Sequence, residues 1–262
     1  MLRLFRFIIV SLFFFVFAIH IYGQEKEKEM PIIKFICIEI GIDFLDSDIP
    51  NYDFIRGDIS YLGSVSATDY LSGYFQKWYF GLKAEVRSKN NKFGLLGGIR
   101  YSSTNSSLGK NTYWESSSDY FFLLLNQEGT TTEFLKIKEV NNSADYIGIP
   151  LEIRYFPYKP RAFRLYFKVA AEFNYLLSDK SEVIFENNTM QNYEAEVLDK
   201  FDKPDNFYTA VYGAVGWNLN LKNKVYINFE VDVPSIFLAD YSSGLIDPIA
   251  GGGFQLFVQI PF

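Results

Sequence analysis

The stretch Phe35-Ile-Cys-Ile-Glu-Ile-Gly-Ile-Asp-Phe44 decides the fold, because its side chains alternate with a period of two. Its even positions are all apolar, from Ile36 to Phe44, whereas the odd positions include Glu39 and Asp43. Successive side chains of a β-strand point to opposite faces, so this pattern predicts a strand with one apolar and one polar face. A strand that separates lipid from a polar interior has this character.

The same alternation recurs seven more times along the chain, in segments 78–87, 93–101, 146–155, 163–174, 207–219, 225–233 and 253–262. Each segment has roughly 9–13 residues, which is enough for a tilted strand to cross the hydrocarbon of a bilayer. An even number of strands is the rule in single-chain bacterial barrels, and closure leaves no unpaired edge in lipid. The sequence therefore predicts an all-β protein, an eight-stranded antiparallel up-and-down transmembrane β-barrel.

The connections between these segments alternate in length. Short ones are expected at 88–92, 156–162 and 220–224, and long ones at 45–74, 102–145, 178–206 and 234–252. Short periplasmic turns and long extracellular loops are typical of outer-membrane barrels. Soluble barrels of the lipocalin kind also have eight strands, but they place their apolar side chains inside. The sequence leaves this alternative open, although the uncharged apolar faces favour lipid outside.

The N-terminus predicts an export signal. Arg3 and Arg6 precede an apolar run at 7–21, Gly23 follows, and a charged stretch begins at Gln24. The run is shorter than a spanning helix requires, and its order is that of a cleaved signal peptide. We expect residues 1–23 to be the signal, 24–33 a periplasmic segment and 34–262 the barrel, located in the outer membrane of a Gram-negative bacterium after cleavage.

The polar faces predict a charged interior, since eight strands leave room for little more than side chains. Seven acids and seven bases occupy inward positions, and pairing would avoid the cost of isolated buried charges. The alternatives to a salt-bridged interior are a narrow conduit, a small-ligand site and a catalytic carboxylate pair at Glu230 and Asp232. The inward charges are Glu39, Asp43, Glu85, Glu152, Glu172, Glu230, Asp232, Lys77, Lys83, Arg87, Arg100, Arg154, Arg164 and Lys168.

Composition argues against several function classes. A formal net charge of −6 without a basic run argues against nucleic acid as a partner. Cys37 is the single cysteine, so a disulfide framework is excluded. His20, the single histidine, leaves with the predicted signal, which removes the usual base of neutral-pH catalysis. We therefore expect no catalytic residue, no cofactor and no metal site, and a protein that is not an enzyme.

The second long connection contains an apolar stretch, residues 113–140, that predicts an extra hairpin with residues 126–129 as its turn. Apolar side chains that project beyond a membrane must be shielded from water by packing against other residues. That shielding would come from neighbouring loops or from a protein partner.

Two segments carry a family resemblance. The chain end, with Leu256, Val258, Ile260 and Phe262 at alternating positions, resembles the C-terminal signal read by the barrel-assembly machinery, although Pro261 departs from it. Tyr146-Ile-Gly-Ile-Pro-Leu-Glu-Ile-Arg-Tyr155 resembles a stretch of PorT-like outer-membrane barrels of Bacteroidota. The resemblance implies outer-membrane lipid and the assembly machinery as partners. We expect a structural or binding role in the cell envelope, as a component of an envelope complex that reaches partners through its long loops. The alternatives are a small-solute channel and a secreted soluble lipid-binding barrel.

Overall fold

A computed structural model describes residues 33–56, 71–110, 119–128, 131–158, 162–221, 225–237 and 241–262. The predicted signal at 1–23 and most of the segment 24–33 lie outside the described residues. Within the described ranges, no helix is long and apolar enough to span a membrane. The strands are β1 (Ile33–Asp48), β2 (Ile55–Arg56), β3 (Leu71–Arg87), β4 (Phe93–Lys110), β5 (Phe121–Glu128), β6 (Thr131–Tyr155), β7 (Phe163–Phe185), β8 (Phe207–Asn220), β9 (Tyr226–Phe237) and β10 (Asp247–Pro261). The 3-10 helix η2 (Asn188–Tyr193) and the helix α2 (Glu194–Leu198) lie between β7 and β8.

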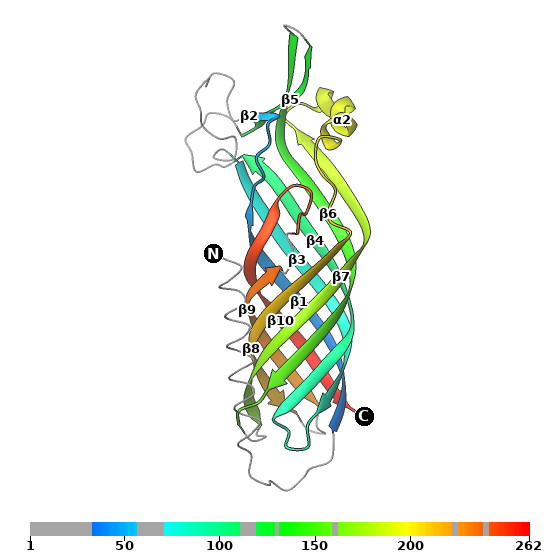
Figure 1. Cartoon of the computed structure of the whole chain (residues 1–262), viewed down its shortest axis with the longest axis vertical. Coiled ribbons are helices and arrows are strands. Elements are labelled where there is room, and N and C mark those ends of the chain that lie inside the picture. The colour runs from blue at the N-terminus through cyan, green and yellow to red at the C-terminus, as the bar shows by residue number, and fades with distance from the viewer. Residues whose placement is uncertain are drawn as a thin grey trace.

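The strands form one antiparallel sheet that closes on itself. Its order is β2-β5-β6-β4-β3-β1-β10-β9-β8-β7, and a further pairing of β6 with β7 closes the ring. The short connections after β3, β6 and β8 lie at one end, the turn end, and β2, β5 and α2 lie at the other, the distal end (Figure 1). The sheet therefore has ten strands where the sequence predicted eight, because β5 pairs with the distal part of β6 and β2 pairs with β5.

Several strands are much longer than predicted. β4 has 18 residues, β6 has 25 and β7 has 23, so they occupy much of the stretches expected as loops at 102–145 and 178–206. In part of these extensions both faces are polar, as in Ser102-Ser-Thr-Asn-Ser-Ser107 of β4. The backbone ladder continues there, pairing Asn105 with Ser143, without any alternation of hydrophobicity that would reveal it. The prediction of long loops was wrong in these segments.

Burial alternates along the ring strands, with the polar face inside. In β1 the side chains of Ile38 and Ile40 are 56% and 60% exposed, whereas Cys37 and Glu39 are 0% and 2% exposed. Leu151 and Phe229 are likewise exposed, and Glu152 and Glu230 are buried. The barrel is thus apolar outside and charged inside, the reverse of a soluble barrel that binds lipid in its interior.

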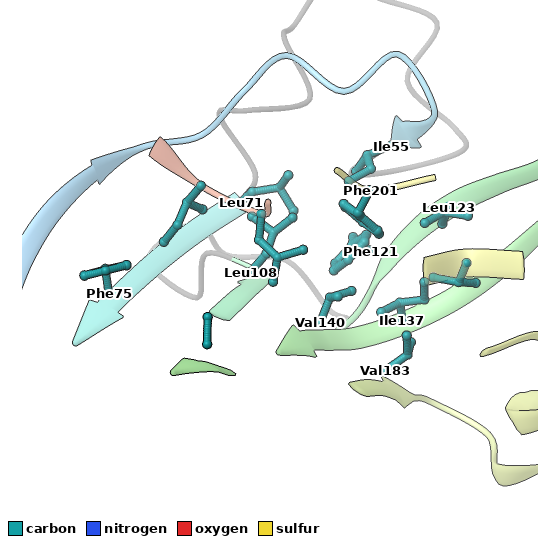
Figure 2. Packing of buried hydrophobic residues seen from close by; sticks show 14 of the residues in the cluster. Ile55, Leu71, Phe75, Leu108, Phe121, Leu123, Ile137, Val140, Val183 and Phe201 are labelled. Atoms are coloured by element: carbon teal, nitrogen blue, oxygen red, sulfur yellow. The ribbon is translucent and has the colours of Figure 1, made fainter. Parts of the chain in front are cut away.

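Apolar side chains fill both ends of the barrel. The distal cluster joins the ring to β2, β5, α2 and the chain after α2, and Figure 2 labels ten of its members: Ile55, Leu71, Phe75, Leu108, Phe121, Leu123, Ile137, Val140, Val183 and Phe201. The turn-end cluster consists of Phe35, Cys37, Leu96, Phe156, Tyr166 and Phe257. Leu96 and Phe257 interrupt the polar inward pattern of their strands, and this cluster explains them.

The predicted hairpin exists as β5 and the start of β6, but its turn is not where the sequence placed it. Residues 126–128 still belong to β5, where a register shift lies between Leu124 and Asn126, and Glu128 pairs with Thr131 of β6. The inward side chains Phe121, Leu123, Leu135 and Ile137 are almost fully buried in the distal cluster. Neighbouring segments of the same chain, including Ile55, therefore cover this face.

Candidate functional site: the charged interior

The barrel interior brings together the inward charges of six of the eight ring strands. Every one of the predicted interior residues is buried, with at most 8% of its surface exposed: Glu39, Asp43, Glu85, Glu152, Glu172, Glu230, Asp232, Lys77, Lys83, Arg87, Arg100, Arg154, Arg164 and Lys168. They come from β1, β3, β4, β6, β7 and β9, because period-two alternation sends these positions of each strand to the inner face.

Glu152 is the centre of one group of ion pairs. Its Oε1 atom lies 2.6 Å from Lys83 Nζ, and its Oε2 atom accepts a hydrogen bond from Arg154 Nη2 at 3.1 Å. Arg154 also lies 3.2 Å from Glu230 Oε1, and Lys168 donates to the other oxygen of Glu230. Four strands are joined in this way, so no charge in the group lacks an opposite charge.

A second group lies nearer the distal end. Arg100 donates from Nε to Glu39 at 2.8 Å and from Nη1 to Glu172. Lys77 donates to the remaining oxygen of Glu172 at 2.8 Å. The ring of Tyr79 lies 4.1 Å from the Arg100 guanidinium, which adds a cation–π contact.

The third group lies at the turn end. Arg87 donates to Glu85 at 2.6 Å and to the amide oxygen of Gln259 at 2.9 Å. The rings of Phe35 and Phe156 lie 4.5 Å and 4.7 Å from the Arg87 guanidinium. The charged interior therefore merges with the turn-end cluster rather than opening to solvent.

The charge network predicted from the sequence left out the uncharged polar members of the interior, although they occupy the same inward faces. Gln259 accepts from Arg87 and from the side-chain amides of Asn218 and Asn228, and Gln255 accepts from Lys168 and Tyr79. Tyr166 donates to Glu230 at 2.6 Å, and the hydroxyl of Tyr212 accepts from Arg100 at 2.9 Å. All occupy inward positions of the same alternation, so the period that identified the charges also contained the signal for these residues.

Two of the interior charges have no ion pair within the described part of the chain. Arg164, near the turn end, donates to the backbone oxygen of Asn91 and lies 4.0 Å from the ring of Phe156. Asp43 lies on β1 toward the distal end, and its Oδ1 atom has no hydrogen-bond partner in the described structure. The other six acids and six bases are paired with one another.

The chemistry available to this interior is limited. Glu230, one half of the carboxylate pair considered from the sequence, is engaged by Lys168, Arg154 and Tyr166. Among the described residues, no group of three or more His, Cys, Asp or Glu side chains is placed to hold a metal ion. The thiol of Cys37 is buried in the turn-end cluster. The arrangement is that of a rigid, internally neutralised interior.

The four residues of the predicted assembly signal lie together on the outer face of β10. Leu256, Ile260 and Phe262 are 47%, 45% and 70% exposed, and Val258 is partly exposed. Pro261 is the last residue of the strand, at its end in the β1–β10 pair, where it opposes Phe35. A strand end tolerates proline, since it removes only one ladder hydrogen bond there.

The closed antiparallel ring and charged interior define the class of the protein, a β-barrel with an apolar outer wall. No family model and no curated protein matches the chain. Among solved structures, the chain is similar to Ail, the attachment invasion locus protein of Yersinia pestis, solved with the heparin analogue sucrose octasulfate, at 12% identity and a TM-score of 0.39 over 89% of this chain and 100% of that one. It is also similar to the Escherichia coli outer membrane protein W, at 13% identity and a TM-score of 0.27 over 85% of this chain and 97% of that one.

Proposed function

We propose that the protein is an outer-membrane β-barrel in which the eight strands of the ring cross the bilayer. The observation that carries this proposal is the apolar outer wall, to which every ring strand contributes. Soluble proteins rarely expose so large an apolar surface, and a bilayer would cover it. Exposed members of the wall are Ile38, Leu82, Ile99, Leu151, Phe167, Leu219, Phe229 and Leu256.

Aromatic side chains on the wall support the same placement. Trp78, Phe80 and Tyr101 form one cluster, with ring centroids 5.3–6.5 Å apart. Phe93 and Tyr155 form another, at 5.2 Å, beside the short turn after β3. Aromatic belts at both interfaces are a general feature of membrane barrels, so these two clusters are candidates for opposite belts.

Export and assembly would depend on two sequence features, one near each terminus. A signal peptide at 1–23 would deliver the chain to the periplasm, and the alternating residues Leu256, Val258, Ile260 and Phe262 would be read by the barrel-assembly machinery. A relationship to PorT-like barrels of Bacteroidota rests on the residues of 146–155 alone.

The role that fits best is structural or binding, without catalysis. Twelve of the fourteen interior charges are paired, and the apolar clusters close the interior at both ends, so neither a small-solute channel nor a lipid-binding cavity is favoured. The distal extension, formed by β5, α2 and the ends of β4, β6 and β7, projects beyond the apolar wall (Figure 1). This part would meet partners in an envelope complex.

Fractionation of cells that express the full chain tests the location. We expect the protein in the outer-membrane fraction, resistant to alkaline extraction and released by detergent. A distal epitope inserted after Glu196, which is exposed on α2, should be accessible on intact cells, and one inserted in the turn at 88–92 should not. Release by buffer without detergent would contradict the proposal and favour the secreted soluble barrel.

A further inference from the structure

Asp43 occupies an unusual position in the interior. In the register of the sheet it is opposite Lys77 of β3 on one side and Gly253 of β10 on the other, and Gly253 is in turn opposite Asp232 of β9. A Cβ atom at Gly253 would lie 2.1 Å from Asp43 Oδ1. The carboxylate of Asp43 therefore lies over Gly253 and points toward β9, the strand that carries Asp232.

The bases around Asp43 are bound to other acids. Lys77 donates to Glu172 at 2.8 Å, and Arg100 of β4 is shared between Glu39 and Glu172. Lys168 of β7 donates to Glu230 and, at 3.2 Å, to Gln255, and its distance to Asp232 Oδ1 is 3.5 Å.

Both aspartates consequently have an oxygen without a donor. Asp43 Oδ1 and Asp232 Oδ1 are buried and accept no hydrogen bond in the described structure. The hydroxyl of Tyr79 lies 3.5 Å from Asp232 Oδ2 and 3.3 Å from Gln255 Oε1. Two ionised carboxylates close together in a desolvated site repel each other, and one proton held between them removes that repulsion.

We infer that Asp43 and Asp232 hold one proton between them in the folded barrel, while the remaining interior acids are ionised and paired. The site is a proton-binding site built beside Gly253, whose missing side chain leaves the space that the Asp43 carboxylate occupies. Release of the shared proton would leave an unpaired negative charge beneath the distal cluster. The stability of the barrel would therefore depend on pH. This inference needs the described fold but not the membrane location.

The composition leaves few other groups that could cause a pH dependence of stability near neutral pH. After residue 23 the chain has no histidine, so few groups have ordinary pKa values between pH 6 and 8. The unfolded chain has both aspartates ionised there, whereas the folded barrel retains one proton. Stability must therefore be greatest at low pH in this window and fall as pH rises, with the unfolding constant increasing by up to about ten-fold per pH unit while the folded barrel retains the proton, and levelling off once that proton is released.

The experiment is a series of urea unfolding titrations of residues 24–262, refolded in lipid vesicles, from about pH 6 to about pH 8. We expect the ten-fold dependence in the wild type, and we expect Asp43→Asn to abolish it because the amide cannot release a proton. Asp46→Asn, an exposed carboxylate on the same strand, is the matched control and should retain it. A wild type without pH dependence, or a dependence unchanged by Asp43→Asn, would overturn the inference.

Infrared spectroscopy of the folded wild type supplies a second measurement that does not require unfolding. A carbonyl band of a protonated carboxylic acid should be present at neutral pH and should disappear at high pH. If Asp43→Asn does not fold, Asp232→Asn takes its place in the titrations. Absence of the acid band from the folded wild type would refute the shared proton whatever the variants do.

Discussion

Single residues in this barrel follow a simple rule, because the environment of each is set by whether its position is odd or even. Glu152 and Leu151 are adjacent on β6, yet one is 0% and the other 50% exposed. Glu152 contacts Lys83 and Arg154, and Leu151 faces outward from the wall. Substitutions at adjacent positions of one strand should therefore destabilise the barrel for different reasons, one inside and one on the outer wall.

Glu152→Gln should destabilise the barrel by about 3–5 kcal/mol, because it removes one partner from a buried group and leaves Lys83 and Arg154 undercompensated. Urea titration in lipid vesicles measures the free energy of unfolding. Glu186→Gln is the control: Glu186 pairs with Lys138 at 2.9 Å on the surface, where such pairs contribute roughly 0–1 kcal/mol. Equal losses in the two variants would show that the interior charges are solvated.

Leu151→Arg should cost ~2–4 kcal/mol in the same titration if the wall is in contact with lipid near the bilayer midplane. The matched control is Asn105→Arg, at an exposed position of the β4 extension, where the side chain would face water. We expect its cost to be close to zero. If both arginines are tolerated equally, the apolar wall does not face hydrocarbon.

At the scale of elements, the sequence pattern predicted the wall-forming part of each strand. It did not predict the strand extensions beyond that part. Phe93–Tyr101 of β4 alternates because one face meets an apolar surrounding, but Ser102–Ser107 is polar on both faces and gives no such signal. Backbone pairing with β6 sustains the strand there. Interior positions follow from alternation, whereas the choice of partner for each charge depends on the closed ring, which no local pattern contains.

The hairpin of β5 and β6 gives a prediction at this scale. Phe121→Ala should cost about 3–5 kcal/mol locally, since its ring is fully buried in the distal cluster. The loss should appear as faster proteolysis and amide exchange of β5 and α2, with the wall-forming strands unaffected. Phe122→Ala, at the half-buried neighbouring position, is the control and should change these rates much less. Uniform loss of protection throughout the barrel would contradict the separation of the distal part from the ring.

The whole molecule is a cylinder whose interior changes character along its axis. The turn-end cluster, the paired charges and the distal cluster follow one another from the short turns to α2. Arg87 and Arg164 contact aromatic rings at one end, and Tyr146, Tyr208 and Tyr241 pack together at the other, with ring centroids 4.5–6.4 Å apart. Ions would have to displace apolar side chains at both ends and break ion pairs between them.

Purified protein reconstituted in a planar bilayer should therefore give no steady current at neutral pH, in contrast to a porin inserted in the same bilayer as a positive control. The physical reason is that each paired charge already has its counter-ion, and the apolar clusters exclude the water that a conducting ion carries. Replacing Phe75, Tyr208 and Tyr241 together by alanine removes much of the distal cluster on the axis and tests whether that cluster is the barrier. A small current in this variant alone would place the barrier there, and silence in both would place it in the paired charges or in the turn-end cluster. A steady current through the wild type would contradict the closed interior and restore the small-solute channel as the function.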